Sequence, residues 1–360
     1  MKIQAVIGAN YGDEGKGLVS GCLAREAHRR HEKVLTVFYN GTTQRAHTFE
    51  DEIHRAMAAG TKYGSDTYYH HMFVIDPISL WILQAKPIIH PRCRIILPCD
   101  VMRNRKKEAE RGAARHGTCG FGLYEAVSRS KNFPYKIEAE MLKEPYELYE
   151  AIRKIEKEYP AEYDDLYNLD NFMRAAAYLT ANCRMLTLGE IAGDYDTIIY
   201  EGGQGLLLDQ ANTDCFPHLT PSSVGCRNIA DDVYMLKPKS VELYYVSRSY
   251  LTRHGAGPME NECSKEDICE NIVDSTNQEN EWQGALRFGK LDLQAMAARI
   301  SKDSDCLRSR YTTRNIVFTQ LNYTDEALYT VNGKCAVDAI RNVDNVYVSD
   351  QKDQMELLRY

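Results

Sequence analysis

The residues best suited to do chemistry lie in a glycine-rich segment at positions 8–17, which reads GANYGDEGKG. A strand pattern over residues 3–8 precedes it, and a helical pattern over about residues 16–30 follows. In such a turn, backbone N–H groups and the helix dipole can bind phosphate oxygens. Asp13 is an available oxygen ligand for Mg²⁺, and Lys16 is an available positive charge for phosphates. The segment therefore predicts a site for a phosphorylated ligand.

This segment is not a Walker A motif. That motif requires glycine at position 10 and serine or threonine at position 17, where this chain has Asn10 and Gly17. Because the hydroxyl group is missing, another residue must hold Mg²⁺. A generic glycine-rich turn is the simpler alternative, but such a turn has no use for acidic and basic side chains among its glycines.

Composition limits the classes of protein and partner. The chain has 360 residues, 44% of them hydrophobic, which is enough for one large domain or two closely packed lobes. Its formal net charge of −7 argues against a nucleic-acid or membrane partner. The 11 cysteines form no CxxC pair, and no leader or long apolar span is evident. We expect a cytoplasmic protein, located in the host cytoplasm if it is viral.

Short apolar runs separated by helix-length segments predict the fold class. After a second strand over residues 34–38, these runs cover residues 72–75, 94–97, 197–200, 241–246 and 315–321. The pattern is typical of an α/β fold with a mostly parallel central sheet and surrounding helices. We expect a single domain over residues 1–360, with a helical sub-lobe over about residues 100–190 that is most charged between residues 136 and 190.

Several ordered blocks resemble adenylosuccinate synthetases. The GDEGKG signature of that family matches residues 12–17, and its Gly-His-Thr segment resembles the surroundings of His47. The preceding Gly-Gly-His-Asn of the family is altered to GTTQ at residues 41–44. Residues 200–209, YEGGQGLLLD, resemble Phe-Glu-Gly-Ala-Gln-Gly-Thr-Leu-Leu-Asp, and residues 252–258, TRHGAGP, resemble Thr-Arg-Val-Gly-Ala-Gly-Pro. A further block, FPHLTPSS, resembles Tyr-Pro-x-Val-Thr-Ser-Ser.

The resemblance implies a ligase that joins aspartate to the 6-position of a purine monophosphate. In the family's scheme, Asp13 takes the proton from ring N1, His47 stabilises the charge on the 6-oxygen, and Lys16 assists phosphoryl transfer to that oxygen. The amine of aspartate then displaces phosphate. Mg²⁺ would be bound by Asp13 and a backbone carbonyl near Ala46.

The same resemblance assigns residues to each substrate. The triphosphate site comprises Gly12, Glu14, Gly15, Lys16, Gly17, Thr48, Gln320 and Asn322. The purine monophosphate site comprises Asp13, Gln44, Thr118, Cys119, Arg129, Gln204 and Thr220. The aspartate site comprises Gln283, Gly284 and Arg287. Arg129 corresponds to an arginine that the family donates across its dimer interface, which implies a homodimer.

Two departures from the family bear on substrate choice. The family reads guanine with Thr-Lys-Leu-Asp, whereas residues 319–322 are TQLN. The amide of Asn322 both donates and accepts, which suits adenine, so we expect ATP or dATP as donor, although Asn322 can simply end a strand. Ala285 replaces an arginine near the ribose. Loss of a charged donor to the 2′-hydroxyl costs about 1.5–3 kcal/mol of ribose preference and favours deoxyribonucleotides.

Both departures resemble the viral branch of the family. That branch condenses dGMP with L-aspartate to N6-succino-2-amino-2′-deoxyadenylate for 2-aminoadenine DNA. An adenylosuccinate synthetase acting on IMP, aspartate and GTP is the alternative within the family. Outside it, a non-catalytic purine-nucleotide regulator needs no group to deprotonate a purine, and a plain kinase consumes triphosphate without aspartate.

Overall fold

The computed structural model describes residues 1–132, 135–273, 284–307, 309–324, 343–349 and 354–357. The helices of this part are α1 (Lys16–Arg29), α2 (Pro77–Ile82), α3 (Pro98–Arg111), α4 (Leu123–Arg129), α5 (Pro145–Glu158), α6 (Leu169–Asn182), α7 (Leu188–Ile191), α8 (Ala230–Leu236) and α9 (Leu293–Ser304). The strands are β1 (Lys2–Gly8), β2 (Val34–Phe38), β3 (Ala46–Phe49), β4 (Glu52–Arg55), β5 (Asp66–Tyr69), β6 (Val74–Ile75), β7 (Ile88–Ile89), β8 (Arg94–Ile95), β9 (Thr197–Gly205), β10 (Val241–Arg248), β11 (Leu251–Arg253), β12 (Glu262–Cys263), β13 (Arg287–Gly289), β14 (Thr312–Thr319), β15 (Asn345–Ser349) and β16 (Glu356–Leu357).

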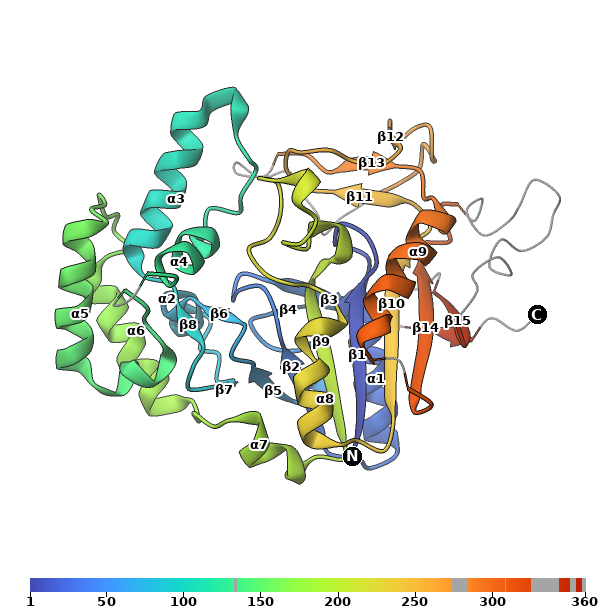
Figure 1. Cartoon of the computed structure of the whole chain (residues 1–360), viewed down its shortest axis with the longest axis horizontal. Helices are drawn as coiled ribbons and strands as arrows, with labels where there is room; N and C mark the ends of the chain where they lie inside the picture. The colour runs from blue at the N-terminus through green and yellow to red at the C-terminus, as the bar shows by residue number, and fades with distance from the viewer. Residues whose placement is uncertain (133–134, 274–283, 308, 325–342, 350–353, 358–360) are drawn as a thin grey trace.

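A central sheet organises the molecule. Within the described residues it has nine strands in the order β16-β15-β14-β10-β1-β9-β2-β5-β7. Neighbouring strands are parallel, except for the antiparallel pair of β15 and β16. The prediction of a mostly parallel sheet with surrounding helices is confirmed. Since β1 begins at the N-terminus and the strands beside it run the same way, their carboxyl ends meet at one edge (Figure 1).

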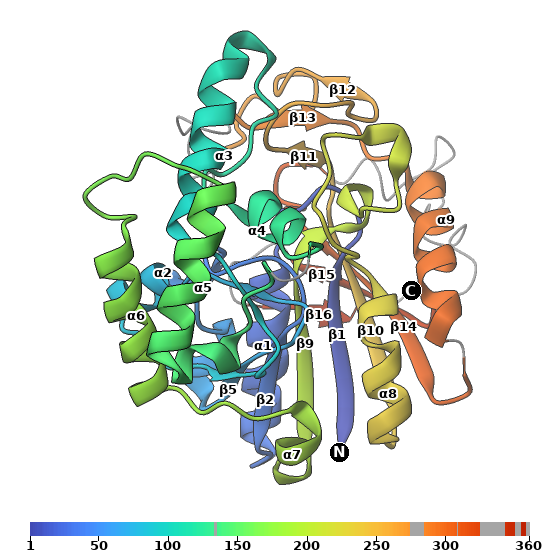
Figure 2. The ribbon, with the colours of Figure 1, turned by 60° about the vertical axis from the view of Figure 1, so that its left-hand side comes forward.

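Side chains of the sheet alternate between two hydrophobic layers. On β1, Ala5 and Ile7 pack into the cluster that contains Met296 of α9, whereas Val6 packs into the cluster that contains Val19 of α1. Figures 1 and 2 show α8 and α9 on one side of the sheet and α1 on the other. The alternation follows from the two-residue period of a strand, and burial on both faces explains why β1 reads as a continuous apolar run.

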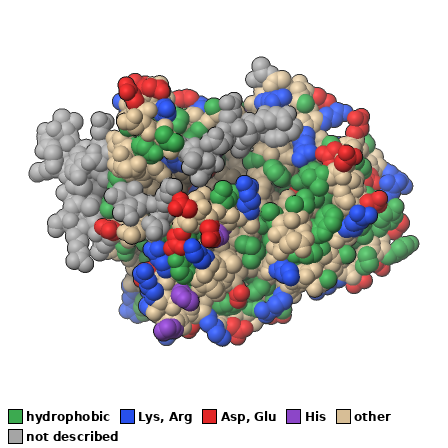
Figure 3. Space-filling view, turned by 180° about the vertical axis from the view of Figure 1, so that it is seen from behind, with side chains coloured by type: hydrophobic (Ala, Val, Ile, Leu, Met, Phe, Trp, Pro, Cys, Tyr) green, Lys and Arg blue, Asp and Glu red, His purple; other side chains and the backbone are tan. Residues whose placement is uncertain are grey.

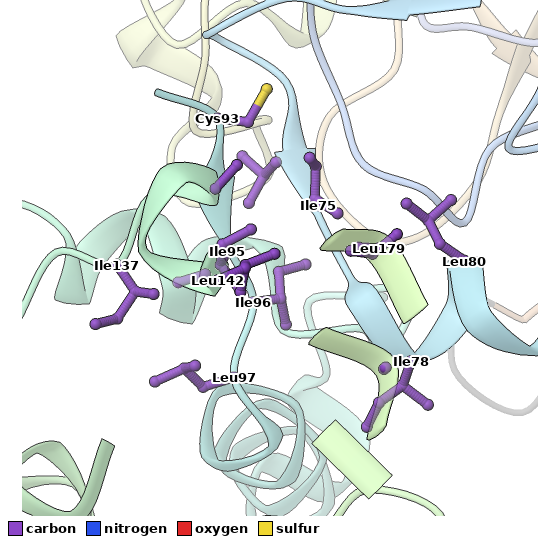
Figure 4. Close-up of a cluster of buried hydrophobic side chains, with 14 of the residues drawn as sticks. Ile75, Ile78, Leu80, Cys93, Ile95, Ile96, Leu97, Ile137, Leu142 and Leu179 are labelled. Carbon is purple, nitrogen blue, oxygen red and sulfur yellow. The ribbon is translucent and has the colours of Figure 1, made fainter. Parts of the chain in front are cut away.

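A second hydrophobic core lies in the helical lobe. Helices α3 to α6 pack beside a two-stranded sheet of β6 and β8, and Ile75, Ile95, Leu97, Leu142 and Leu179 converge there (Figure 4). Strands do lie within the expected residues 72–75 and 94–97. They pair with each other, however, and do not join the central sheet.

The outer surface agrees with the charge balance of the sequence. On the face seen in Figure 3, lysine and arginine side chains are interspersed with aspartate and glutamate. Among the described helices, none combines the length and apolar character that a membrane span requires.

Candidate active site

The phosphate loop, residues 9–15, joins β1 to α1 at the carboxyl edge of the sheet. Gly12 and Gly15 have φ angles of 113° and 101°, which favour glycine, and Asp13 between them has a φ of 57°. This backbone course turns the Asp13 side chain outward, where it is 37% exposed. Asp13 is therefore accessible to a ligand even though its neighbours on both sides are buried.

Glu14 fixes the shape of this loop from inside. Its carboxylate accepts hydrogen bonds from the N–H groups of Asn10 at 3.0 Å and Gly12 at 2.9 Å. It also forms an ion pair with Lys16 Nζ at 2.5 Å, and both side chains are almost fully buried. Glu14 and Lys16, assigned from the sequence to phosphate binding, thus hold each other. An incoming phosphate has to share the Lys16 charge with Glu14.

The missing hydroxyl at position 17 has a steric explanation. A Cβ atom on Gly17 would lie 2.4 Å from His47 Cβ, so only glycine allows β3 to pack against the start of α1. The contact brings His47, which the resemblance assigns to catalysis, to the phosphate loop. Ala46 is exposed and Thr48 is half-buried in the same strand. The site therefore gains a histidine where a Walker A motif has a serine or threonine.

His47 belongs to a buried cluster of charged side chains. Its Nδ1 lies 2.6 Å from Glu201 Oε1, and Arg45 Nη2 lies 2.8 Å from the same oxygen. Ser20 donates to the other oxygen of Glu201 at 2.6 Å. The Glu201 side chain is 1% exposed, so these contacts stand in for solvent. Because an ionised carboxylate only accepts, the proton lies on His47 Nδ1.

The protonation of this cluster follows from its surroundings. Burial alone would raise the pKa of the Glu201 carboxyl, but the charges of Arg45 and His47 lower it to about 2. Burial and the neighbouring Arg45 charge lower the pKa of His47, while Glu201 opposes that shift. Glu201 is therefore ionised at neutral pH. A second proton on His47 would give an imidazolium able to donate to an oxygen that gains negative charge.

Asp13 lies among groups that come from distant segments. His254 Nε2 is 3.6 Å from Asp13 Oδ2, and Arg248 Nε donates to the backbone oxygen of Asp13 at 2.5 Å. Burial raises the pKa of the Cys119 thiol, and the Asp13 charge adds to the rise, whereas a hydrogen bond with Gln44 opposes it. Asp13, Gln44 and Cys119 are thus brought together, as expected for a shared ligand.

Two buried side-chain oxygens of residues assigned to the purine monophosphate have no hydrogen-bond partner in the described part of the chain. Thr220 is 8% exposed, and neither its Oγ1 nor Gln44 Oε1 forms a hydrogen bond within the described part of the chain. Gln204 Oε1 lies 3.7 Å from the position that a Cβ on Gly12 would take, so it faces the phosphate loop. Thr118 differs, since its hydroxyl donates to Asn104 Oδ1 at 3.2 Å. Buried polar atoms without partners fit a site that a polar ligand completes.

The segment expected to read the donor base adjoins the phosphate loop. A Cβ on Gly15 would lie 3.1 Å from Thr319 Cγ2, and Thr319 Oγ1 donates to the backbone oxygen of Glu14 at 2.7 Å. The next residue, Gln320, has a φ of 61°, and Asn322 is exposed beyond it. A triphosphate on the loop can therefore extend its base towards these residues.

The segment expected to hold aspartate is only partly visible. Gln283 lies outside the described residues, and Gly284 has a φ of 70°. Arg287 on β13 makes a two-point ion pair with Glu262, at 2.7 Å and 2.6 Å. Its remaining Nη1 donates to the carbonyl oxygens of Gly255 and Gly257. Arg287 therefore already binds a carboxylate of the protein itself.

The structure does not bring Arg129 into this cluster. Its side chain is 1% exposed and pairs with Asp100 at 2.7 Å, and its other N–H groups donate to the carbonyl oxygens of Ile95 and Tyr135. Every guanidinium nitrogen of Arg129 is therefore engaged within this chain. In this arrangement Arg129 ties α4 to α3, and the expectation that it reaches a substrate phosphate across a dimer stays a prediction.

Oxygen ligands available at the loop fit Mg²⁺. Mg²⁺ takes hard oxygen donors and usually binds through one or two carboxylates together with substrate phosphates and water. The exposed Asp13 carboxylate meets that requirement, and the exposed Ala46 places a backbone carbonyl in the same region. Among the described residues there is no group of three or more His, Cys, Asp or Glu side chains that could hold a metal ion.

Four residues of this site were not assigned from the sequence: Arg45, Glu201, Arg248 and His254. Glu201 lies inside a block that resembles the family, and Arg45 lies beside one. Their positions in the sequence could therefore have indicated that they belong to the site. His254 could have been noticed because it differs from the family, which has valine at this position.

Comparisons with known proteins agree with these blocks. The family model described as "Adenylosuccinate synthetase" matches residues 5–307. The adenylosuccinate synthetase of Coxiella burnetii (strain RSA 493 / Nine Mile phase I) is 28% identical over 290 residues, which cover 73% of this chain and 65% of that protein. The one from Clostridium perfringens (strain 13 / Type A) is 24% identical over 295 residues, covering 74% and 67%. This chain thus spans 65% of the length of the Coxiella protein.

Two solved structures share the fold. A fully ligated adenylosuccinate synthetase from Plasmodium falciparum superposes with a TM-score of 0.69 at 20% identity, covering 91% of this chain and 78% of its own. The succinoaminodeoxyadenylate synthetase of cyanophage S-2L, bound to dGMP and to dATP as an energy donor, gives a TM-score of 0.64 at 17% identity, covering 99% of this chain and 95% of its own.

Proposed function

The chain belongs to the adenylosuccinate synthetase family, and we propose that it is a C–N ligase that condenses dGMP with L-aspartate, using ATP or dATP as phosphoryl donor. The product would be N6-succino-2-amino-2′-deoxyadenylate, with release of nucleoside diphosphate and phosphate. The observation that carries the proposal is the convergence of the exposed Asp13 carboxylate and the His47–Glu201 pair at one phosphate loop. A nucleotide-binding regulator has no use for either group.

The proposed reaction has two steps. Asp13 takes the proton from purine N1, and the negative charge moves to the 6-oxygen, which His47 stabilises. That oxygen then attacks the γ-phosphorus, and the 6-phosphoryl group so formed is displaced by the amine of aspartate. Asp13 and the backbone carbonyl near Ala46 would hold Mg²⁺, which would neutralise charge on the triphosphate when bound. Gln204, Gln44 and Thr220 position the purine monophosphate.

Two features support the deoxyguanylate acceptor over IMP. Ala285 removes a charged donor from the ribose side, which weakens the preference for a 2′-hydroxyl. The chain also shares its fold with the cyanophage S-2L enzyme, whose structure is bound to dGMP and dATP. Condensation of IMP with aspartate remains the alternative within the family.

A matrix of substrates tests the proposal directly. IMP and dGMP are each combined with ATP and with GTP in the presence of aspartate, and phosphate release and the succino-nucleotide are measured. We expect turnover with dGMP and ATP. Turnover of IMP with dGMP left untouched would make this a short adenylosuccinate synthetase. Phosphate transfer that does not require aspartate would make it a kinase, and binding without turnover would make it a regulator.

Asn322 provides a prediction about the donor. Replacing it by aspartate removes a hydrogen-bond donor and supplies the carboxylate that guanine recognises. We expect the ratio of kcat/KM for ATP over GTP to fall by about tenfold or more in Asn322→Asp, as for one recognition hydrogen bond. Asn345→Asp, at the start of β15 and paired with Asn315, is the control and should leave the ratio unchanged. Equal rates with ATP and GTP in both proteins would mean that Asn322 only ends the strand.

Glu262 provides a prediction about aspartate. Its carboxylate occupies Arg287 in the way that a substrate carboxylate would, and both side chains are partly exposed. Surface pairs of this kind contribute up to about 1 kcal/mol, so Glu262→Gln should lower KM for aspartate about two- to fivefold with little change in kcat. Asp267→Asn, an exposed residue bonded to Ser264, is the control. A higher KM in Glu262→Gln would show that Glu262 supports Arg287 instead of competing for it.

A further inference from the structure

Two side chains of α3 hold the segment that follows this helix, residues 116–120. Glu108 Oε2 accepts hydrogen bonds from the N–H groups of Gly117 at 3.0 Å and Thr118 at 3.4 Å. Asn104 Oδ1 accepts a hydrogen bond from the Thr118 hydroxyl at 3.2 Å. Residues four apart in a helix lie on the same face, so one face of α3 holds both the backbone and the side chain of Thr118.

The burial of Glu108 makes these hydrogen bonds hard to replace. Its side chain is 0% exposed, and Arg111 forms an ion pair with its other oxygen. A carboxylate out of contact with water needs donors from the protein, and two backbone N–H groups of the segment supply them here. Arg105 Nε donates to the carbonyl oxygen of Gly120 at 3.1 Å, so α3 holds the far end of the segment as well.

The segment is also confined by residues that do not belong to α3. A Cβ atom on Gly117 would lie 2.5 Å from Gly255 Cα, so the two backbones are in direct contact. The rings of His116 and His218 pack edge to face, with their centroids 5.2 Å apart. These contacts leave residues 116–120 little freedom to shift while the hydrogen bonds to α3 are intact.

Cys119 connects this segment to the candidate active site. Burial raises the pKa of its thiol, a hydrogen bond with Gln44 opposes this rise, and the nearby Asp13 charge adds to it. The thiol therefore lies beside two residues that are assigned to the purine monophosphate. Thr118 is turned towards α3, since its hydroxyl and its N–H group are both bonded there. Two neighbouring residues with the same assignment thus have different surroundings.

We propose that Glu108 is a positioning residue for the purine monophosphate, because it holds residues 116–120 so that Cys119 meets the ligand and Thr118 does not. Without its carboxylate the segment can shift, which weakens binding of the monophosphate. The phosphate loop should keep its shape, since Glu14 holds that loop independently. This inference rests on the proposed function and names a residue outside the ligand's reach that shapes the acceptor site.

The main test is Glu108→Ala, which removes the acceptor of both N–H groups. We expect KM and Kd for dGMP to rise about tenfold or more, as for loss of a hydrogen bond to a charged group, while kcat and KM for ATP change less than about twofold. Glu108→Gln keeps a side-chain oxygen and should recover most of the affinity. Glu110→Ala, at an exposed position of the same helix, is the matched control and should behave as the unmodified protein. Thermal unfolding of each variant identifies any loss of folding.

A second set of variants tests the different roles of Thr118 and Cys119. Asn104→Ala and Thr118→Val remove the same hydrogen bond, so the double variant should bind dGMP within about twofold of either single variant. Cys119→Ala should weaken binding of dGMP by about three- to tenfold, as for one neutral hydrogen bond. A further loss when Thr118→Val is added to Asn104→Ala would mean that the Thr118 hydroxyl binds the ligand, and would overturn the inference.

The outcomes separate this inference from the proposed function. If Glu108→Ala is folded and binds dGMP as tightly as the unmodified protein, Glu108 has no positioning role. An equal rise in KM for dGMP and ATP also overturns the inference, because Glu108 would then support the fold as a whole. If the unmodified protein condenses neither dGMP nor IMP with aspartate, the proposed function fails, whereas equilibrium binding of these nucleotides to Glu108→Ala still decides the role of Glu108. If it binds neither nucleotide, both proposals fail.

Discussion

Asp13→Asn is expected to lower kcat for the condensation by about 10²–10⁴-fold, the usual contribution of a general acid or base. Asparagine keeps the size of the side chain and tolerates the positive φ of this position, so the loop should keep its course. The amide cannot take the N1 proton. It also removes a charged oxygen ligand for Mg²⁺. Steady-state kinetics with dGMP, ATP and aspartate measure the effect.

Binding distinguishes lost chemistry from a damaged site. Asp13→Asn and Asp13→Ala should bind dGMP with a Kd within a few-fold of the unmodified protein, because Gln204, Gln44 and Thr220 remain. Asp165→Asn, an exposed residue of the helical lobe, is the control and should keep full activity. Near-normal kcat in Asp13→Asn would remove Asp13 from the role of base and with it the proposed mechanism.

The local order around the phosphate loop was predictable because its signals are local. Apolar runs and a glycine-rich turn indicated strands over residues 3–8 and 34–38 and a helix from about residue 16, and β1, β2 and α1 lie there. The short strands β5 and β7 carry no comparable run, since each contributes only two to four residues at the sheet edge. Their pairing is set by neighbours far along the chain, which a single sequence does not reveal.

The sequence blocks that form the site could be predicted, but the contacts between their side chains could not. His47 and Gly17 were both noted, yet their packing against each other depends on β3 folding onto α1. Glu201 lies 154 residues from His47 in sequence, and only the sheet order makes them partners. Arg129 is a different case. Its position matched a family residue, but Asp100 on α3 was close enough in the fold to engage it first.

Glu201→Gln is expected to lower the free energy of unfolding by about 3–5 kcal/mol, the usual cost of removing one member of a buried ion pair. Arg45, with 7% exposure, would keep its charge without the carboxylate that balances it. Ser20 and His47 would also lose an ionised acceptor. Urea unfolding at pH 7 followed by circular dichroism measures the change.

The pH dependence of folding stability provides a second, independent test of the Glu201→Gln prediction. The folded pKa of Glu201 is about 2, below the ordinary value of 4.5 for a glutamate. The carboxylate therefore stabilises the fold above pH 4.5, and this stabilisation is lost as pH falls towards 2. A difference of this size corresponds to about 3 kcal/mol. Between pH 5 and pH 3, the free energy of unfolding should therefore fall more in the unmodified protein than in Glu201→Gln. This difference should equal the part of the destabilisation of Glu201→Gln at pH 7 that is due to the lost charge.

The double variant Arg45→Met/Glu201→Gln distinguishes two causes of the lower stability of Glu201→Gln: loss of the ion pair with Arg45 and loss of packing. Removing both charges leaves no unbalanced ion, and methionine keeps the apolar stem that lies over the Phe38 ring. The double variant should be at least as stable as Glu201→Gln alone. If the two losses simply add, the charges do not interact and Glu201 acts through packing. If the double variant recovers stability but not kcat, the pair is needed for His47 in catalysis as well as for the fold.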